Sequence, residues 1–522
     1  MTDAFDTSVL IIGAGPTGLA LACDLARRGV AHRVVERNPA PSRTTRAKAI
    51  QPRSLEVLDD LGAVDHVLRR GVAGLPVRFH EPAGAVVDKP PISVRADEKF
   101  HTPYPDVLWL GQFDVEQALR QRLGELGGHV EFAAEVVGIE QDDDGVSVTL
   151  RTPDGDRGVR ARFVVGADGG KSTTRKLAGL PLVGRTYEEQ RWYLGDVTVP
   201  GLDRGHIHIW PSEHGMLCLT PLGDDLWQFQ SPILPGEQAG APSMEFYQQL
   251  FDARAGKGAV ALGSASWLSV YQVNVRMVEN YRNGRVLLAG DAAHVHSPAG
   301  GQGMNTGIQD AYNLGWKITS VLDGARIHLL DTYGAERIPV ARTVLETSTE
   351  KMSRTMAQAG RGAEDGLGSA LARIGDGALN SGLGIHYRTS PLVHPGGPTS
   401  GPVPGDRAPN VGGLRGEGFS GDLFDLMRGP HWSLIAYEHT DPVIFDNAKP
   451  THMHVHRIGS TSDSAVVDSE GEFQRVYQPY PGELILIRTD GYLIARVPAD
   501  REKDVIEHLA PFRSIGTQVR PY

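Results

Sequence analysis

Cysteine, long apolar runs and excess positive charge are all scarce in this sequence of 522 residues. The two cysteines, Cys23 and Cys218, form neither a CxxC pair nor a metal-ligand spacing. Isolated thiols fit a reducing compartment, and we expect both to be small buried side chains. No apolar run reaches the roughly 18 residues of a membrane span, and no signal-peptide pattern opens the sequence. We therefore expect a cytoplasmic protein with no membrane partner.

The charge balance is acidic, with 52 Lys and Arg against 63 Asp and Glu and a formal net charge of −11. Nucleic-acid binding normally requires a basic face, so this balance argues against such a partner. The length suggests roughly two to four domains. The Pro- and Gly-rich stretch His394–Gly405 (HPGGPTSGPVPG) predicts a linker between two of them.

The first motif lies in a predicted strand–helix–strand unit. The apolar run Ser8–Ile12 leads into Gly13–Gly18 (GAGPTG), a helix follows, and a second strand covers His32–Glu36. In GxGxxG the glycines permit a tight turn, close approach of a pyrophosphate and close helix packing. The helix N-terminus favours the phosphate charge, and Glu36 can accept hydrogen bonds from ribose hydroxyls. The unit predicts dinucleotide binding, with FAD or NAD favoured over a 2′-phosphate.

Two further glycine motifs follow predicted buried strands. Gly166–Arg175 (GADGGKSTTR) comes first, and Gly290–Gly307 (GDAAHVHSPAGGQGMNTG) comes second. The side-chain-poor run Gly300–Gly303 lets a planar ring approach the backbone, and the helix starting near Met304 directs its positive end at that ring. His294 and His296 lack further ligands at metal spacing, so we expect no metal site.

Together the three motifs resemble the class A FAD-dependent monooxygenases, the family of p-hydroxybenzoate hydroxylase. Within it the sequence is similar to phenol and polyketide hydroxylases, which carry a thioredoxin-like C-terminal domain. The resemblance implies an α/β fold with a Rossmann-like FAD-binding domain and an inserted antiparallel-sheet substrate domain. The implied boundaries are 1–180 with 276–394, 70–105 with 181–275, and 400–522. The last segment contains no cysteine, so thiol–disulfide chemistry is excluded there.

The resemblance also implies the cofactors: bound FAD, NADPH or NADH as a transient co-substrate, and O₂, with oxygen transfer through a flavin C4a-hydroperoxide. It places Pro298 against the flavin ring and Asp291 on the ribityl chain, and Ser172 and Arg175 match the family pattern. The expected cofactor-binding residues are Gly13, Gly15, Pro16, Thr17, Gly18, Glu36, Arg37, Arg46, Gln112, Asp168, Gly169, Asp291, Pro298, Gly301, Gly303, Met304 and Asn305.

The sequence identifies no catalytic base. His206 and His208 alternate with Ile207 and Ile209 on a predicted strand, where a solvent-facing histidine pair is favoured over a pair in the pocket. Other candidates are Pro298 and, on the strand that leads to the third motif, Tyr271, Asn274 and Arg276.

The favoured function is hydroxylation of an aromatic or polyketide-like small molecule. A Baeyer–Villiger or epoxidising monooxygenase, a flavin dehydrogenase or reductase, and a non-catalytic flavoprotein stay open as alternatives, as does a homodimer. Two variants test the cofactor site. Gly13→Val is expected to block the pyrophosphate and abolish FAD retention, and Asp291→Ala is expected to weaken FAD binding.

Overall fold

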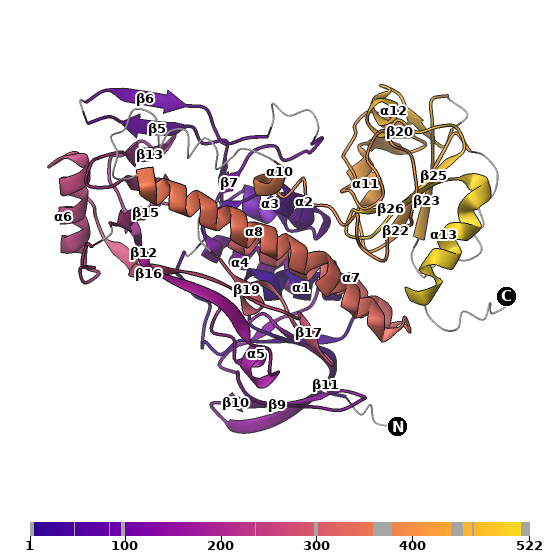
Figure 1. Cartoon of the computed structure of the whole chain (residues 1–522), viewed down its shortest axis with the longest axis horizontal. Coiled ribbons are helices and arrows are strands. Elements are labelled where there is room, and N and C mark those ends of the chain that lie inside the picture. The colour runs from indigo at the N-terminus through magenta and orange to yellow at the C-terminus, as the bar shows by residue number, and fades with distance from the viewer. Residues whose placement is uncertain are drawn as a thin grey trace.

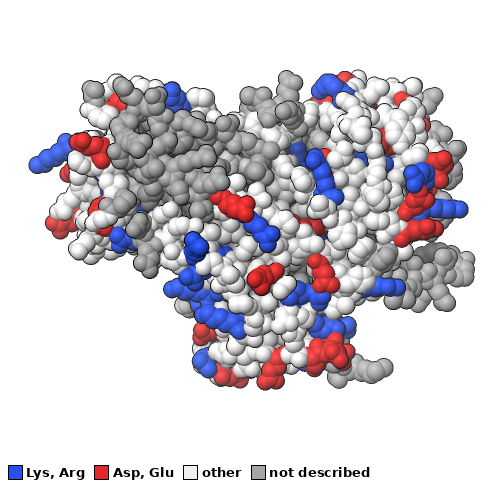
Figure 2. Space-filling view, viewed as in Figure 1, with Lys and Arg blue, Asp and Glu red and all other residues white. Residues whose placement is uncertain are grey.

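The computed structural model describes residues 5–45, 47–82, 84–94, 100–234, 236–296, 301–358, 378–439, 453–461 and 464–512. Figure 1 shows two large sheets crossed by the long helix α8, and beside them a lobe built from the end of the chain. Positive and negative side chains are interspersed over the described part of the face in Figure 2. Within the described ranges, no helix is long and apolar enough to cross a membrane.

The first sheet contains the predicted strand–helix–strand unit, and its central strands run parallel. Val9 and Ile11 of β1 pack against helices α1, α4 and α7, while Leu10 and Ile12 pack against the β9–β10 hairpin. Burial on both faces explains the unbroken apolar run of this strand. The strands are β1 (Thr7–Ile12), β2 (His32–Val35), β8 (Val130–Glu131), β9 (Glu135–Gln141), β10 (Val146–Thr152), β11 (Gly155–Gly166), β17 (Arg282–Asn283) and β18 (Val286–Leu288).

Several helices surround this sheet, and α7 starts one residue before the predicted Met304. Gly29, with φ +70°, follows the end of α1 in the left-handed conformation that commonly ends a helix. The helices are α1 (Pro16–Arg27), α2 (Pro52–Asp60), α3 (Val64–Leu68), α4 (Gln112–Glu125), α5 (Thr173–Leu177), η1 (Gly290–Ala292), α7 (Gly303–Leu322), η2 (Ile327–Leu330), α8 (Asp331–Gln358) and α10 (Ala378–Ser381). A small sheet of β3 (Ala49–Ile50), β4 (Val72–Ala73) and β7 (Leu108–Trp109) lies between the first sheet's helices and the second sheet.

The apolar pattern over Val130–Ile139 predicts a single strand. The structure divides it, because β8 pairs with β2 while β9 pairs with β10. Ala133 lies between them with φ +55°, a left-handed conformation that ends one strand before the next begins.

The alternating pattern of residues 181–275 predicts an antiparallel sheet of short strands. The second sheet is mostly antiparallel, as predicted, but it is built around two long strands. β12 and β16 pair along most of their length, and β5 joins the sheet by parallel pairing with β13. The elements are β5 (Val77–His80), β6 (Val86–Lys89), β12 (Leu182–Thr198), β13 (Ile207–Trp210), β14 (Leu217–Pro221), β15 (Leu226–Ile233), β16 (Ala265–Val278), β19 (His294–Val295) and α6 (Met244–Ala255).

The third sheet is mixed and forms the lobe at the right of Figure 1. Its elements are β20 (Leu414–Gly416), β21 (Phe419–Gly421), β22 (Trp432–Tyr437), β23 (Met453–Gly459), β24 (Val466–Asp468), β25 (Glu483–Ile487), β26 (Leu493–Pro498), α11 (Leu423–Met427), α12 (Glu472–Tyr477), η4 (Ala499–Arg501), α13 (Glu502–Leu509) and η5 (Ala510–Phe512).

The Pro- and Gly-rich stretch is packed against this lobe and is not a free linker. His394 N donates to Ile494 O at 2.9 Å, and Gly405 N donates to Leu493 O at 2.8 Å. His394 is buried. Both ends of the stretch therefore lie along β26. The Pro- and Gly-rich composition indicated turns correctly, but it could not show that this stretch forms hydrogen bonds with β26.

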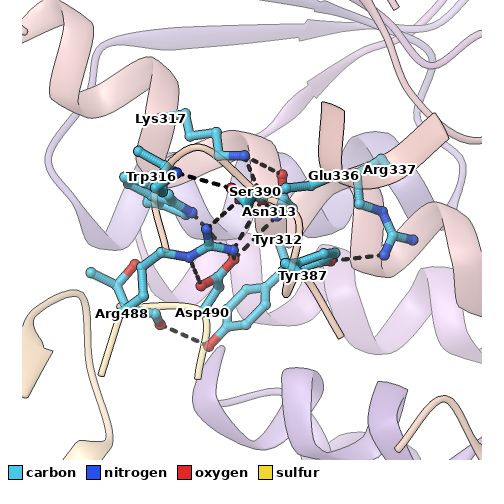
Figure 3. Close-up of polar contacts among 12 residues, drawn as sticks. Tyr312, Asn313, Trp316, Lys317, Glu336, Arg337, Tyr387, Ser390, Arg488 and Asp490 are labelled. Atoms are coloured by element: carbon cyan, nitrogen blue, oxygen red, sulfur yellow. Dashed lines mark hydrogen bonds and ion pairs between the residues drawn. The ribbon is translucent and has the colours of Figure 1, made fainter. Parts of the chain in front are cut away.

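A buried network of charges joins the third sheet to α7 and α8 (Figure 3). Arg488 lies between the carboxylates of Glu336 and Asp490 at 2.6–3.1 Å. Lys317 on α7 donates to Glu336 at 2.7 Å, and Trp316 on the same helix donates its indole N–H to Asp490 at 3.3 Å. All four charged side chains are 0–1% exposed. The C-terminal lobe thereby fixes the helix that starts at the third glycine motif.

Candidate functional site

The three glycine motifs meet at the carboxyl ends of β1, β11 and β18. Gly13 has φ +106°, and a Cβ there would lie 2.4 Å from Ala167 O in the second motif. A Cβ on Gly307, in α7, would lie 2.2 Å from Thr17 Oγ1 and 3.3 Å from Gly290 Cα. Only glycine permits these approaches, so the motifs form one continuous structure.

Gly15 differs from the other glycines of the first motif because a Cβ there would have no atom within 4 Å. It is the N-cap of α1, and Pro16 occupies the first helical position. Backbone N–H groups at this helix end therefore face open space, where an anion can approach. Gly13 instead packs on the second motif. Its replacement by valine would disrupt the fold itself, which corrects the expectation that Gly13→Val acts by blocking the pyrophosphate.

Glu36 lies beside the first motif, as the sequence predicted. Its carboxylate accepts hydrogen bonds from Ala14 N at 3.1 Å and from Asn38 N at 3.0 Å. Arg37 follows it as an exposed side chain. The Glu36 carboxylate is thus held beside the glycine loop, in a position suited to the ribose of an adenine dinucleotide.

The Asp168 side chain is bound within its own loop. Its carboxylate accepts from the hydroxyls of Ser172 and Thr174 and from the N–H groups of Thr173 and Thr174, at 2.5–3.1 Å. The carboxylate therefore caps α5, and the open position of this motif is Gly169, where a Cβ would have no atom within 4 Å.

Arg175 joins the second motif to the third. It is buried, and its guanidinium donates to Gly170 O and Ala292 O, both at 3.0 Å. The sequence noted Arg175 only through the family resemblance, and the structure shows its positioning contacts.

Asp291 is exposed at the start of η1, in contrast to its buried neighbours Gly290 and Ala292. A Cβ on Gly303, the first residue of α7, would lie 3.9 Å from Asp291 Oδ1. An accessible carboxylate thus stands beside the positive end of a helix of 20 residues. The arrangement suits a ligand that combines hydroxyl donors with a group that gains negative charge.

Asn305 holds the loop before α7 instead of offering a free amide. Its side chain accepts from Gln51 N at 2.9 Å and donates to Ala49 O at 3.0 Å and to Gly301 O at 2.6 Å. Gly301 has φ +62°, and Met304 is buried.

Gln112 is the first residue of α4 and donates to Glu116 at 2.8 Å. Burial raises the pKa of the Glu116 carboxyl to about 7.

Two predicted cofactor contacts, Arg46 and Pro298, lie outside the described residues.

Sequence reasoning missed two side chains that support the third motif. Asp310 accepts from His294 Nε2 at 2.7 Å and from Gly290 N at 3.1 Å, and Arg337 donates to Asp310 at 2.6 Å. Asp310 and Arg337 form an ion pair whose side chains are 0% exposed. Such burial of charged side chains marks them as important, but it can be recognised only in the folded structure.

The candidate residues on β16 point to opposite faces, because strand side chains alternate. Tyr271 lies on the face of the apolar cluster that includes Ala49, Trp109, Trp192 and Ile209, and its hydroxyl donates to His296 O at 3.3 Å. Asn274 and Arg276 share Thr186 as a partner on the other face. Of the three candidates, Tyr271 alone lies on the face of that cluster, and contact of any of them with a substrate stays a prediction. Ala49 is 3.6 Å from a Cβ built on Gly301, so the Tyr271 face adjoins the third motif.

The histidine pair on β13 lies on the α6 side of the sheet. His208 is only 1% exposed and contacts His80 Nε2 and Asp203 O at 2.8 and 2.7 Å. His206 contacts the Asp203 carboxylate at 2.6 Å. The solvent-facing interpretation was wrong for His208, because the rings of His80, Trp210 and Trp227 pack around it. Neither ring is on the face of the apolar cluster beside Gly301.

A buried polar cluster links the loop before β3 to the second sheet. Lys48 donates to Thr220 and Gln230, and burial lowers its pKa. Asp196 accepts from Thr45 N at 2.8 Å, and burial raises the pKa of its carboxyl to about 6. These contacts fix the position of β3 relative to the second sheet.

Comparisons with known proteins agree with this geometry. The family model described as "FAD binding domain" matches residues 6–348. The chain is 36% identical to a flavin-dependent monooxygenase of Mycobacteroides abscessus, covering 96% of this chain and 99% of that protein. It is 34% identical to 6-methylpretetramide 4-monooxygenase of Streptomyces rimosus, covering 95% and 91%. The structure of aklavinone-11 hydroxylase with FAD and aklavinone matches with a TM-score of 0.83 and 26% identity, covering 98% and 99%.

Proposed function

The chain belongs to the FAD-dependent monooxygenases that carry this FAD binding domain, and on that premise we propose that it hydroxylates a polycyclic aromatic, polyketide-like small molecule. The observation that carries the proposal is the convergence of open Gly15, exposed Asp291 and the start of α7 at one place, next to an apolar face of the second sheet. Relatives that act on 6-methylpretetramide and bind aklavinone support the substrate class.

The residues present fit FAD. The N-terminus of α1 at Gly15 would bind the pyrophosphate, Glu36 the ribose and Asp291 the ribityl hydroxyls. The start of α7 would stabilise negative charge on the flavin ring. When bound and reduced by NADPH or NADH, FAD supplies the chemistry that activates O₂. The predicted roles of the individual residues remain proposals to be tested by substitution.

The apolar face beside Gly301 would hold the substrate and exclude water from the oxygen-transfer step. Trp192 lies in this cluster, and its buried indole N–H has no hydrogen-bond acceptor among the described residues. An unpaired buried donor costs about 1–3 kcal/mol, so we propose that it donates to an oxygen of the substrate. Tyr271, on the same face, is the hydroxyl best placed to contact a phenolic substrate.

The test uses the purified holoenzyme, NADPH or NADH, ¹⁸O₂ and a panel of polycyclic phenols. We expect one ligand class to accelerate NAD(P)H oxidation and to gain one ¹⁸O atom, detected by mass spectrometry. Product formation without label would favour a dehydrogenase, and bound FAD without NAD(P)H oxidation would favour a non-catalytic flavoprotein. An inserted ring oxygen, seen by NMR, would indicate a Baeyer–Villiger reaction instead.

Matched tryptophan variants test the substrate face. Trp192→Phe removes the unpaired donor and should raise the KM for the substrate with little change in FAD content. Trp227→Phe is the control, because Trp227 is also buried but belongs to the α6 side of the same sheet. An unchanged KM in Trp192→Phe would remove this residue from the proposed site.

Cytoplasmic localisation and the homodimer also remain proposals. The two cysteines are free and buried, which supports a reducing compartment. Size-exclusion chromatography with light scattering would distinguish a monomer from a dimer.

A further inference from the structure

Three histidines meet at one end of the third sheet, away from the glycine motifs. His454 and His456 are two residues apart on β23 and therefore share a face. His431 directly precedes β22, whose Trp432 pairs in parallel with Met453 of β23. The rings of His431 and His454 are stacked with centroids 3.7 Å apart, and the ring of His456 is 6.3 Å from that of His454.

The three rings can act as ligands together. One ligand nitrogen from each lies within 4.8 Å of the other two. Tetrahedral Zn²⁺ with Zn–N distances of 2.0–2.1 Å places two ligand nitrogens about 3.4 Å apart. Binding one ion would therefore require the stacked rings of His431 and His454 to rotate out of their nearly parallel arrangement. A His-x-His pair on one strand with a third histidine from the neighbouring strand thus provides three ligands and leaves a fourth position for water.

Ring stacking alone does not explain this arrangement. His456 Nε2 is buried and has no hydrogen-bond partner among the described residues, which is unfavourable for a polar atom. His454 is exposed, so an ion could reach the cluster from solvent. His431 Nε2 lies 3.4 Å from Leu426 O, and a carbonyl partner of this kind commonly orients a metal-binding imidazole.

We propose that His431, His454 and His456 form a binding site for a divalent transition-metal ion, with Zn²⁺ as the first candidate. Imidazole ligands suit Zn²⁺, Cu²⁺ and Ni²⁺ better than Mg²⁺ or Ca²⁺. The sequence predicted no metal site, because His431 is 23 residues from His454 and parallel pairing alone brings them together.

The proposed site adjoins the contact between the C-terminal lobe and the FAD-binding part. Gly429 N, two residues before His431, donates to Asp60 Oδ1 at 2.8 Å, and Arg28 donates to Pro430 O at 3.2 Å. All three ligands belong to the lobe, so bound metal would connect this docked loop to β23. The ion would lie at the junction, distinct from the proposed oxygen chemistry.

The experiment uses tag-free holoenzyme, depleted of metal with a chelator and titrated with Zn²⁺ by calorimetry. We expect one ion per chain and a Tm that rises with Zn²⁺ concentration. His456→Gln should weaken binding by roughly tenfold or more. His214→Ala, which removes a histidine that is 69% exposed and outside the cluster, should bind like the unmodified protein.

Co²⁺ provides a test that needs no variant, because tetrahedral Co²⁺ bound to imidazoles absorbs in the visible range. We expect that absorption in the unmodified protein and its displacement by Zn²⁺. His431→Gln serves as the second ligand variant if His456→Gln misfolds by circular dichroism. Absence of the Co²⁺ absorption, or equal Zn²⁺ binding by the folded ligand variant and His214→Ala, would overturn the proposal. FAD content, followed in the same samples, reports on the proposed function independently.

Discussion

Arg488→Met should strongly destabilise the protein, although Arg488 belongs to the C-terminal lobe and not to the FAD-binding sheet. Its guanidinium makes four charge-assisted hydrogen bonds of 2.6–3.1 Å to Glu336 and Asp490. With Lys317 the cluster contains two positive and two negative charges, all 0–1% exposed. Arg488 and Lys317 together hold the pKa of Glu336 well below its usual range, against the effect of burial.

The variant would leave a net negative charge in this buried cluster. Removing one partner of a buried pair costs about 3–5 kcal/mol, a large part of a typical folding free energy of about 5–15 kcal/mol. Because Lys317 and Trp316 lie on α7, the loss should also loosen the helix that starts at the third motif. We therefore expect a lower urea midpoint and faster FAD release, measured by tryptophan and flavin fluorescence.

Arg151→Met is the matched control, because Arg151 pairs with Asp156 at the surface with side chains 60% and 50% exposed. Such a pair contributes at most about 1 kcal/mol. The double variant Arg488→Met/Asp490→Asn restores charge balance and should recover part of the loss. If Arg488→Met costs no more than Arg151→Met, the buried network does not support the fold as argued.

Three further outcomes follow from the geometry. Gly15→Val should fold and lose FAD, whereas Gly13→Ala should lower the yield of folded protein. Circular dichroism reports folding, and flavin absorbance after desalting reports bound FAD. Full FAD content in Gly15→Val would contradict the placement of the pyrophosphate at Gly15. Folding raises the pKa of Asp196 from 3.8 to about 6, so the folded state binds this proton more tightly than the unfolded state. As the pH rises through that range, the ionised carboxylate therefore destabilises the folded protein. Asp196→Asn should therefore gain up to about 3 kcal/mol above pH 6 and nothing below pH 4, compared as urea midpoints; a constant gain would refute the assignment. Deleting the chain after residue 400 removes Arg488 and Asp490 from the network and should lower thermal stability sharply, and an unchanged Tm would show that the lobe is dispensable for the fold.

Local patterns predicted the dinucleotide unit well because its chemistry resides in the backbone. The glycine spacing, the helix start and the position of Glu36 depend on residues close together in sequence. The distinct tasks of the glycines did not follow from the motif. Gly13 and Gly15 are equivalent in the pattern, but one packs against Ala167 and the other faces open space. That difference is set by the second motif, more than 150 residues away.

Side-chain roles depended on contacts that the sequence could not reveal. The alternation of His206 and His208 with Ile207 and Ile209 holds in the structure, but strand pairing with β5 and the packing of Trp210 and Trp227 bury His208 on the face that the sequence pattern assigns to solvent. The Glu336–Arg488 pair joins residues 152 positions apart.

The three histidines of the proposed metal site could not be recognised as a group from the sequence. His454 and His456 are separated by one residue, a spacing that any strand would place on a common face. Such a pair alone is ordinary in a protein with 19 histidines. It becomes a candidate site only because β22 pairs in parallel with β23 and brings His431 to it, and because Gly429 docks on Asp60. The ligand set is therefore a property of the sheet register and of the junction between lobes, so a shift of that register should abolish metal binding while leaving all three histidines in the sequence.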